Sequence, residues 1–221
     1  MNGAVNPAIQ EAVRLLHAKQ PAQAKRVLQP LMPQLRKHSE ALKLFAVILI
    51  EAGEADKAIA TIGKAMKLKP MDIGLAVANA KILSQAGRFQ PAIAAFERCL
   101  ALQPTNTEAV DGLVRALRLV RRDQDAVAAV QRAIDAGAPT DAFIAAAIGE
   151  AALANVDPGL DRNHAIDVLK QVLASGTVPA GASSELGFRL GTLLDREGRT
   201  DEAFAAFADA NAVVGATFDA E

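Results

Sequence analysis

The chain has 221 residues, of which 51% are hydrophobic and 22% charged, with a formal net charge of −1. This balance is typical of a globular protein with a sizeable core, and it gives no global charge that would favour nucleic acid or an anionic membrane surface. The N-terminal residues lack the pattern of a signal peptide, and the longest apolar run, Leu44 to Ile50, is too short to span a bilayer. Cys99 is the only cysteine, which excludes an intramolecular disulfide. We expect a cytoplasmic protein without membrane insertion.

Alanine is abundant, Trp and Tyr are absent, and β-branched residues are scattered along the chain. This composition favours helices that pack closely through small residues, and it argues against a β-sandwich or a barrel. We therefore predict an all-α fold.

The same residue types recur every 34 residues along the chain. Gly53 recurs as Gly87, and Arg121 stands at the next such position. A period of this length is the signature of stacked helical hairpins, because one hairpin cannot bury its apolar face alone. We predict six hairpins, at residues 5–38, 39–72, 73–106, 107–140, 141–177 and 184–215, and a short tail at 216–221.

Each predicted hairpin has a turn between two helices with apolar periodicity. A glycine such as Gly53 supplies the positive φ that ends the first helix at little steric cost. An alanine, Ala58 in the second copy and Ala92 in the third, lets the two helix axes approach closely. The first and fifth copies are degenerate, and an insertion at 156–160 delays the second helix of the fifth copy.

The sixth copy is the best formed, with Leu190, Gly191, Gly198, Ala203 and Phe207 at fixed spacing. On these residues the chain resembles the tetratricopeptide repeat (TPR) family. The resemblance implies a right-handed α-solenoid of about six TPR-like units that forms a single superhelix over residues 1–221. It also implies a protein-interaction scaffold, whose partner peptide or protein lies in a concave groove lined by the first helix of each unit.

The residue positions that would line this groove are mildly basic. An acidic peptide would be attracted to such a surface, although ordinary solvated helix charges explain it equally well. RNA is disfavoured because the net charge is −1. The groove candidates are Lys43, Val47 and Ile50; Val77, Lys81 and Ser84; Asp111, Arg115 and Arg118; and Phe188, Thr192 and Asp195.

Reactive groups are not concentrated anywhere in the sequence. His17, His38 and His164 lie far apart, and no glycine-rich phosphate loop is present. Cys99 stands where the other copies have alanine, so we interpret it as a small buried hydrophobe. We expect no catalysis, no metal and no cofactor in this chain.

The last predicted helix is unusually apolar for the end of a stack. Exposed side chains of this kind favour association. We predict that they are covered by the tail, by a further domain or by a second copy of the chain. The association-face candidates are Phe204, Phe207, Val213 and Phe218.

A second resemblance concerns the same segment. Asp195, Gly198, Arg199, the run Asp201 to Ala205, Phe207, Asn211, Phe218 and Asp219 are similar to the last repeat before the catalytic domain of bacterial TPR-linked sulfotransferases. The sulfonate-donor motif P-R-S-G-T is absent. The alternative function is therefore a substrate-recruiting region of a sulfotransferase whose catalytic domain is not in this chain, and a third alternative is an oligomerisation module.

Overall fold

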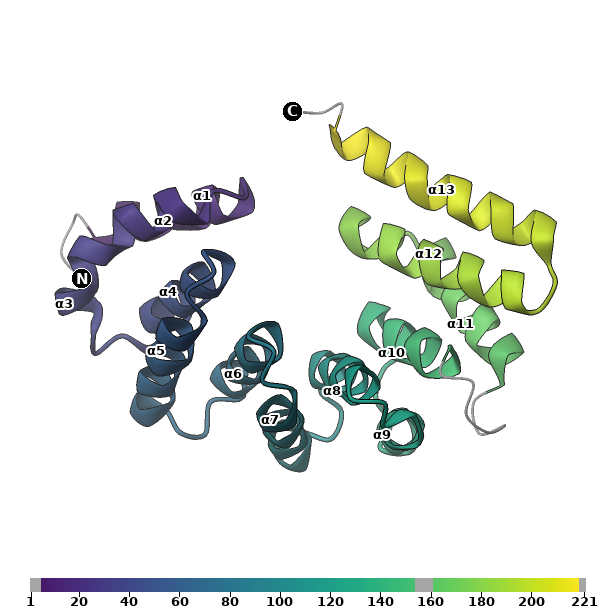
Figure 1. Cartoon of the computed structure of the whole chain (residues 1–221), viewed down its shortest axis with the longest axis horizontal. Helices are drawn as coiled ribbons and strands as arrows, with labels where there is room; N and C mark the ends of the chain where they lie inside the picture. The colour runs from purple at the N-terminus through teal and green to yellow at the C-terminus, as the bar shows by residue number, and fades with distance from the viewer. Residues whose placement is uncertain (1–4, 154–160, 219–221) are drawn as a thin grey trace. The chain divides into compact units, whose positions relative to one another are not determined.

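The computed structural model describes the backbone of residues 5–153 and 161–218, and the side chains of 7–153 and 161–213. All regular structure within these ranges is helical, which confirms the predicted all-α solenoid of helical hairpins (Figure 1). The chain divides into two compact units, Met1–Leu102 and Gln103–Glu221. A single superhelix over the whole chain stays a prediction, and each unit is described by itself below.

The first unit consists of three successive hairpins. Its buried core runs through all of them, from Leu28 through Ile48 and Ile62 to Leu75. The predicted second helix of the first hairpin is broken, because Pro30 and Pro33 stand at the second residue of two new short helices. The helices are α1 (Val5–His17), α2 (Pro21–Leu28), the 3-10 turn η1 (Gln29–Leu31), α3 (Met32–Leu35), α4 (Ser39–Glu51), α5 (Ala55–Leu68), α6 (Ile73–Gln85) and α7 (Phe89–Leu102).

The turns of the first unit confirm the role predicted for glycine. Gly53 and Gly87 have φ of +78° and +72°, in the left-handed region that glycine adopts at little cost. Ala58 and Ala92, at the starts of the helices that follow, are fully buried. Cys99 of α7 is also fully buried, and burial raises the pKa of its thiol, as expected for a small hydrophobe.

The second unit also consists of three hairpins. Its first helices pack side by side, since α10 contacts both α8 and α12 (Figure 1). The last hairpin begins at Ala180, earlier than the predicted 184, and α13 continues through part of the predicted tail. The insertion at 156–160 lies outside the described residues. The helices are α8 (Thr107–Leu119), α9 (Asp123–Asp135), α10 (Ala142–Ala152), α11 (Arg162–Ala174), α12 (Ala180–Arg196) and α13 (Thr200–Phe218).

One turn of the second unit adopts the glycine conformation without glycine. Arg121 has φ of +62°, close to the angle of Gly53 and Gly87 at the equivalent positions. Its N–H donates to the Arg118 carbonyl at 3.0 Å, so the turn geometry is retained. A left-handed backbone costs a residue with a Cβ roughly 1–2 kcal/mol, which this turn retains as strain.

Helices α12 and α13 form the closest helix pair described in the chain. A Cβ added at Gly191 would lie 2.5 Å from Cε1 of Phe207, and one at Gly187 would lie 2.9 Å from Cβ of Ala210. The buried Ser184 hydroxyl donates to the Ala210 carbonyl at 3.1 Å. The two glycines therefore provide the space in which the second helix packs.

Candidate functional site

Six of the predicted groove residues lie on α4 and α6 of the first unit, and two of them, Ile50 and Ser84, are half-buried. Lys43 forms an ion pair with Glu40 one turn earlier, at 2.6 Å, and Val47 is half-buried. Lys81 is exposed on α6. Val77 is only 4% exposed and belongs to the core, which removes it from the candidate surface.

In the second unit, the predicted Arg118 is held by carboxylates of two other helices. Its Nη1 donates to the carbonyl and to Oε1 of Glu150 on α10, at 2.7 and 2.6 Å. Its Nε donates to Oδ1 of Asp123, at the start of α9, at 3.4 Å. The side chain is 23% exposed, so this guanidinium mainly joins helices rather than facing solvent.

The predicted Arg115 and Asp111 pair with each other one helical turn apart on α8. The Nε of Arg115 donates to both carboxylate oxygens of Asp111, at 3.1 and 3.0 Å. Its Nη2 lies 2.7 Å from Oε1 of Glu185 on α12. The same Glu185 oxygen accepts from Nη2 of Arg189 at 2.8 Å, so a single oxygen bridges two guanidinium groups.

Arg189 completes the connection back to α10. Its Nε lies 3.3 Å from Oε2 of Glu150. A Cβ added at Gly149 would lie 3.5 Å from Cδ of Arg189, an ordinary van der Waals distance, so the arginine side chain packs directly on α10. The side chain of Arg189 is 10% exposed, and its Nη1 is buried without a hydrogen-bond partner.

These residues form one connected group, which we call the arginine–carboxylate network. Sequence analysis found Asp111, Arg115 and Arg118 but missed the members on α9, α10 and α12. One signal was available, because Glu150 is the one charged residue of an otherwise apolar α10. The network consists of Asp111, Arg115, Arg118, Asp123, Glu150, Glu185 and Arg189.

The network has three arginines and four carboxylates, so this face of the unit is not basic as predicted. Burial raises the pKa of Asp111, against the opposing effect of the Arg115 guanidinium. Burial by itself would lower the pKa of Arg115, but the Asp111 and Glu185 carboxylates raise it overall. The charges of the predicted groove arginines are thus largely used within the unit.

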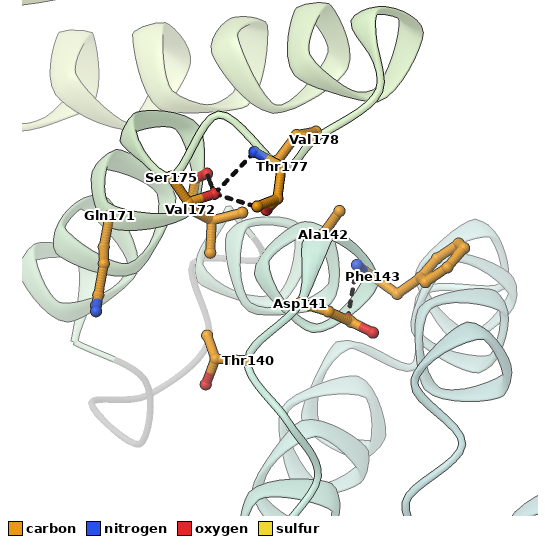
Figure 2. Close-up of a pocket in the computed structure, with 9 residues that line it drawn as sticks. All are labelled: Thr140, Asp141, Ala142, Phe143, Gln171, Val172, Ser175, Thr177 and Val178. Carbon is orange, nitrogen blue, oxygen red and sulfur yellow. Dashed lines mark hydrogen bonds between the residues drawn. The ribbon is translucent and has the colours of Figure 1, made fainter.

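A pocket of about 340 Å³ lies where α10 begins, α11 ends and the following loop leads into α12 (Figure 2). Methyl groups of Ala142, Val172 and Val178 line it, whereas the ring of Phe143 points away from them in Figure 2. Hydroxyl and amide groups line the rest. The lining residues are Thr140, Asp141, Ala142, Phe143, Gln171, Val172, Ser175, Thr177 and Val178.

The one carboxylate at the pocket is already saturated by its own unit. Oδ1 of Asp141 accepts from the N–H groups of Phe143 and Ile144, at 2.9 and 3.0 Å, and so caps α10. Oδ2 accepts from the Thr107 hydroxyl at 2.6 Å. The pocket is therefore suited to an uncharged apolar side chain with a neutral polar rim around it.

The predicted association-face residues do not share one environment. Phe204 is 76% exposed on α13. Phe207 packs over Gly191, and its ring centroid lies 6.4 Å from that of Phe188, so it belongs to the α12–α13 contact. Val213 is half-buried, and the side chain of Phe218 lies outside the described residues. Self-association through this face stays a prediction.

Phe188, Thr192 and the exposed Asp195 are the remaining predicted groove residues of the second unit. Phe188 is 37% exposed, and the Thr192 hydroxyl donates to its carbonyl at 2.8 Å, within the same helix. Within the described ranges, no three His, Cys, Asp or Glu side chains are placed to hold a metal ion. No helix among the described residues is long and apolar enough to cross a membrane.

Comparison with known families identifies the repeat. One tetratricopeptide repeat model matches residues 15–80 and a second matches residues 80–106. A search of curated proteins finds no significant match. The expected likeness to the repeats of sulfotransferases is not supported by these comparisons.

Several solved structures have the same fold. A thermophilic TPR protein from Thermus thermophilus is 13% identical with a TM-score of 0.64, over 84% of this chain and 98% of that chain. BtubC from P. vanneervenii is 15% identical with a TM-score of 0.63, over 98% and 93%. MamA from Desulfovibrio magneticus RS-1 is 15% identical with a TM-score of 0.56, over 80% and 96%. At these identities the likeness concerns the fold alone.

Proposed function

Because this chain contains tetratricopeptide repeats, we propose that it is a protein-interaction scaffold that binds a segment of a partner protein in the pocket beside α10. Repeats of this kind generally serve as scaffolds without catalysis. The observation that supports this site is the 340 Å³ pocket, which has an apolar floor and no unsatisfied carboxylate. Such a pocket accepts one apolar side chain of a peptide and leaves its backbone near the polar rim.

The size and lining of the pocket favour a branched aliphatic side chain as the anchor. Val172 is 7% exposed at the floor, so an entering side chain would exchange water for methyl contacts. Thr140 and Thr177 offer hydroxyl groups at the rim, which can accept from or donate to a peptide backbone. The pocket thus combines an anchor position with neutral orienting groups.

The test uses peptides selected from a random display library on the full chain. Their affinities are then measured by fluorescence polarisation with wild type and with Ala142→Leu. The added side chain fills the pocket, so we expect at least about tenfold weaker binding, or about 1.4 kcal/mol.

Ala180→Leu is the matched control, because Ala180 is the first residue of α12 as Ala142 is of α10, yet it does not line the pocket. We expect unchanged affinity for this variant. Equal affinity of the selected peptides for wild type and Ala142→Leu would exclude the pocket as the binding site. Circular dichroism confirms that each variant keeps its helices.

A further inference from the structure

We propose that Arg115 and Arg189 form a binding site for an acidic side chain of the partner protein, and that Glu185 of the same chain occupies this site when no partner is bound. The proposal rests on the proposed function, since its ligand belongs to a bound protein. It concerns a different site from the pocket, with different residues and different chemistry.

The geometry at Glu185 is that of a ligand carboxylate between two guanidinium groups. Its Oε1 lies 2.7 Å from Nη2 of Arg115 and 2.8 Å from Nη2 of Arg189, which come from α8 and α12. Glu185 and Arg115 are 45% and 42% exposed, so the outer side of the site faces solvent. An arginine and a carboxylate commonly pair through two parallel hydrogen bonds. Here one oxygen serves two arginines, and neither pairing is of that form.

Arg189 shows that the site is not saturated. Its Nε pairs with Glu150 and its Nη2 with Glu185, while Nη1 is buried and has no partner. A buried guanidinium donor without an acceptor is unfavourable, and native structures rarely leave one. The internal carboxylate therefore holds Arg189 in place without satisfying all of its donors.

Exchange of the two carboxylates needs only a side-chain rotation. Glu185 lies near the exposed start of α12, one turn before Arg189, and its side chain can rotate into solvent. The partner's carboxylate brings the same charge, so the balance around Asp111, Arg115 and Glu150 is kept. Glu185 competes as a tethered group at high effective concentration. A lone carboxylate therefore binds weakly, and a partner needs a second contact.

The pocket supplies a second contact at a suitable distance. Ala142 of the pocket and Glu150, whose carboxylate pairs with Arg189 of the proposed site, lie eight residues apart on α10, which is about 12 Å along the helix axis. An extended peptide covers roughly 3.3–3.6 Å per residue, so about four residues span this distance. The ligand we infer carries an acidic residue about four positions from its apolar anchor.

The test measures the site without the pocket. Hexaglutamate with both ends blocked is titrated into the full chain by isothermal calorimetry at physiological ionic strength. Glu185→Gln keeps the shape of the side chain but removes the competing charge, so we expect at least about fivefold tighter binding than in wild type. Blocked hexaglutamine should not bind. Hexaglutamine with a free C-terminal carboxylate separates the two sources of carboxylate, and tighter binding of that probe than of hexaglutamate would overturn the side-chain assignment.

Glu202→Gln is the matched control, because Glu202 also accepts from two cations, Arg199 and Lys170, and its loss changes the net charge equally. We expect less than a twofold change. An equal gain in the Glu185 and Glu202 variants would reduce the effect to general electrostatics, and no gain in Glu185→Gln would show that the site is not occupied by Glu185.

Removal of an arginine in the Glu185→Gln background should abolish the gain. Arg115→Gln is used for this, since that side chain is 42% exposed and the glutamine amide keeps a hydrogen-bond donor near Asp111. Unchanged tight binding in the double variant would exclude the two-arginine site. A failure of Ala142→Leu to weaken selected peptides would overturn the pocket but leave the hexaglutamate result standing, so the two proposals fail separately.

Discussion

The two units use the same helical hairpin, but they differ in how neighbouring hairpins are joined. In the first unit, glycine stands at the turns at Gly53 and Gly87 while Lys19, with φ of +56°, stands at the first turn, and hairpins join mainly through aliphatic contacts. In the second unit, Arg121 replaces the turn glycine, and a partly buried arginine–carboxylate network joins the first helices. The residues matched by the repeat models, 15–106, coincide almost entirely with the first unit.

The comparison of the two units indicates where functional residues lie in a repeat protein. Residues that maintain the hairpin are shared between copies, because every copy solves the same packing problem. The pocket and the network both lie in the second unit, most of which is outside the residues matched by the repeat models. Residues that depart from the shared pattern lower the free energy of unfolding at some positions. Substitutions at such positions measure by how much.

The largest expected effect concerns the close contact of α12 and α13. Gly191→Ala places a Cβ 2.5 Å from the Phe207 ring, which must then move out of its site. Overpacking of this kind typically costs about 1–3 kcal/mol. Urea unfolding followed by circular dichroism measures the change, and Phe207→Leu in the same chain should recover part of the loss.

The same substitution in the first unit should have the opposite sign. A Cβ at Gly63 of α5 meets nothing within 4 Å. Alanine is favoured over glycine in a helix interior by about 1 kcal/mol, so Gly63→Ala should stabilise. Destabilisation by both variants to the same degree would contradict the assigned role of Gly191.

A smaller effect is expected at the turn of the second unit. Arg121→Gly removes a side chain from a residue with φ of +62° and should raise the free energy of unfolding by about 0.5–1 kcal/mol. Ala128→Gly, at an exposed position in the interior of α9, should lower it by about 1 kcal/mol because it lies in regular helix. If the urea midpoints of the two variants move in the same direction, the different roles assigned to the turn residue and to the helix residue are contradicted.

The smallest effect is a pair of opposite pH dependences within the second unit. Burial raises the pKa of Asp111 above its ordinary 3.8, so wild type should lose stability relative to Asp111→Asn as the pH rises from 3.8 through the folded pKa. Hydrogen bonds from Arg199 and Lys170 lower the pKa of Glu202 to about 2. Its stabilisation is present above pH 4.5 and is lost as the pH falls toward 2, relative to Glu202→Gln. Equal slopes in thermal unfolding from pH 2 to 7 would contradict this pair.

The hairpins could be predicted because their determinants are local. A turn glycine, an alanine in the next helix and a large residue four places later are read within one copy, and Gly87, Ala92 and Phe96 occupy the predicted places. The interruption of the first hairpin was missed, although Pro30 and Pro33 were visible, since apolar periodicity continues through them.

The network could not be predicted, because its pairs join residues far apart in the sequence. Arg118 contacts Glu150 across 32 positions, and Arg115 contacts Glu185 on a helix two hairpins later. Such contacts depend on the rotation of each helix about its axis, which a 34-residue period does not determine. The sequence places Phe207 both in the helix pair and on the predicted association face. The structure packs its ring over Gly191, which assigns it to the helix pair.

The single thiol of the chain offers a local measure of opening. Cys99 is fully buried in α7, and burial also raises its pKa, so both access and ionisation oppose its reaction with a thiol reagent. Modification then requires the α6–α7 hairpin to separate, and its rate under native conditions follows the population of that opened form. The Cys99 thiol can thus report the opening of the first unit without any substitution. A label on it does not alter the residues proposed to bind ligand in the second unit.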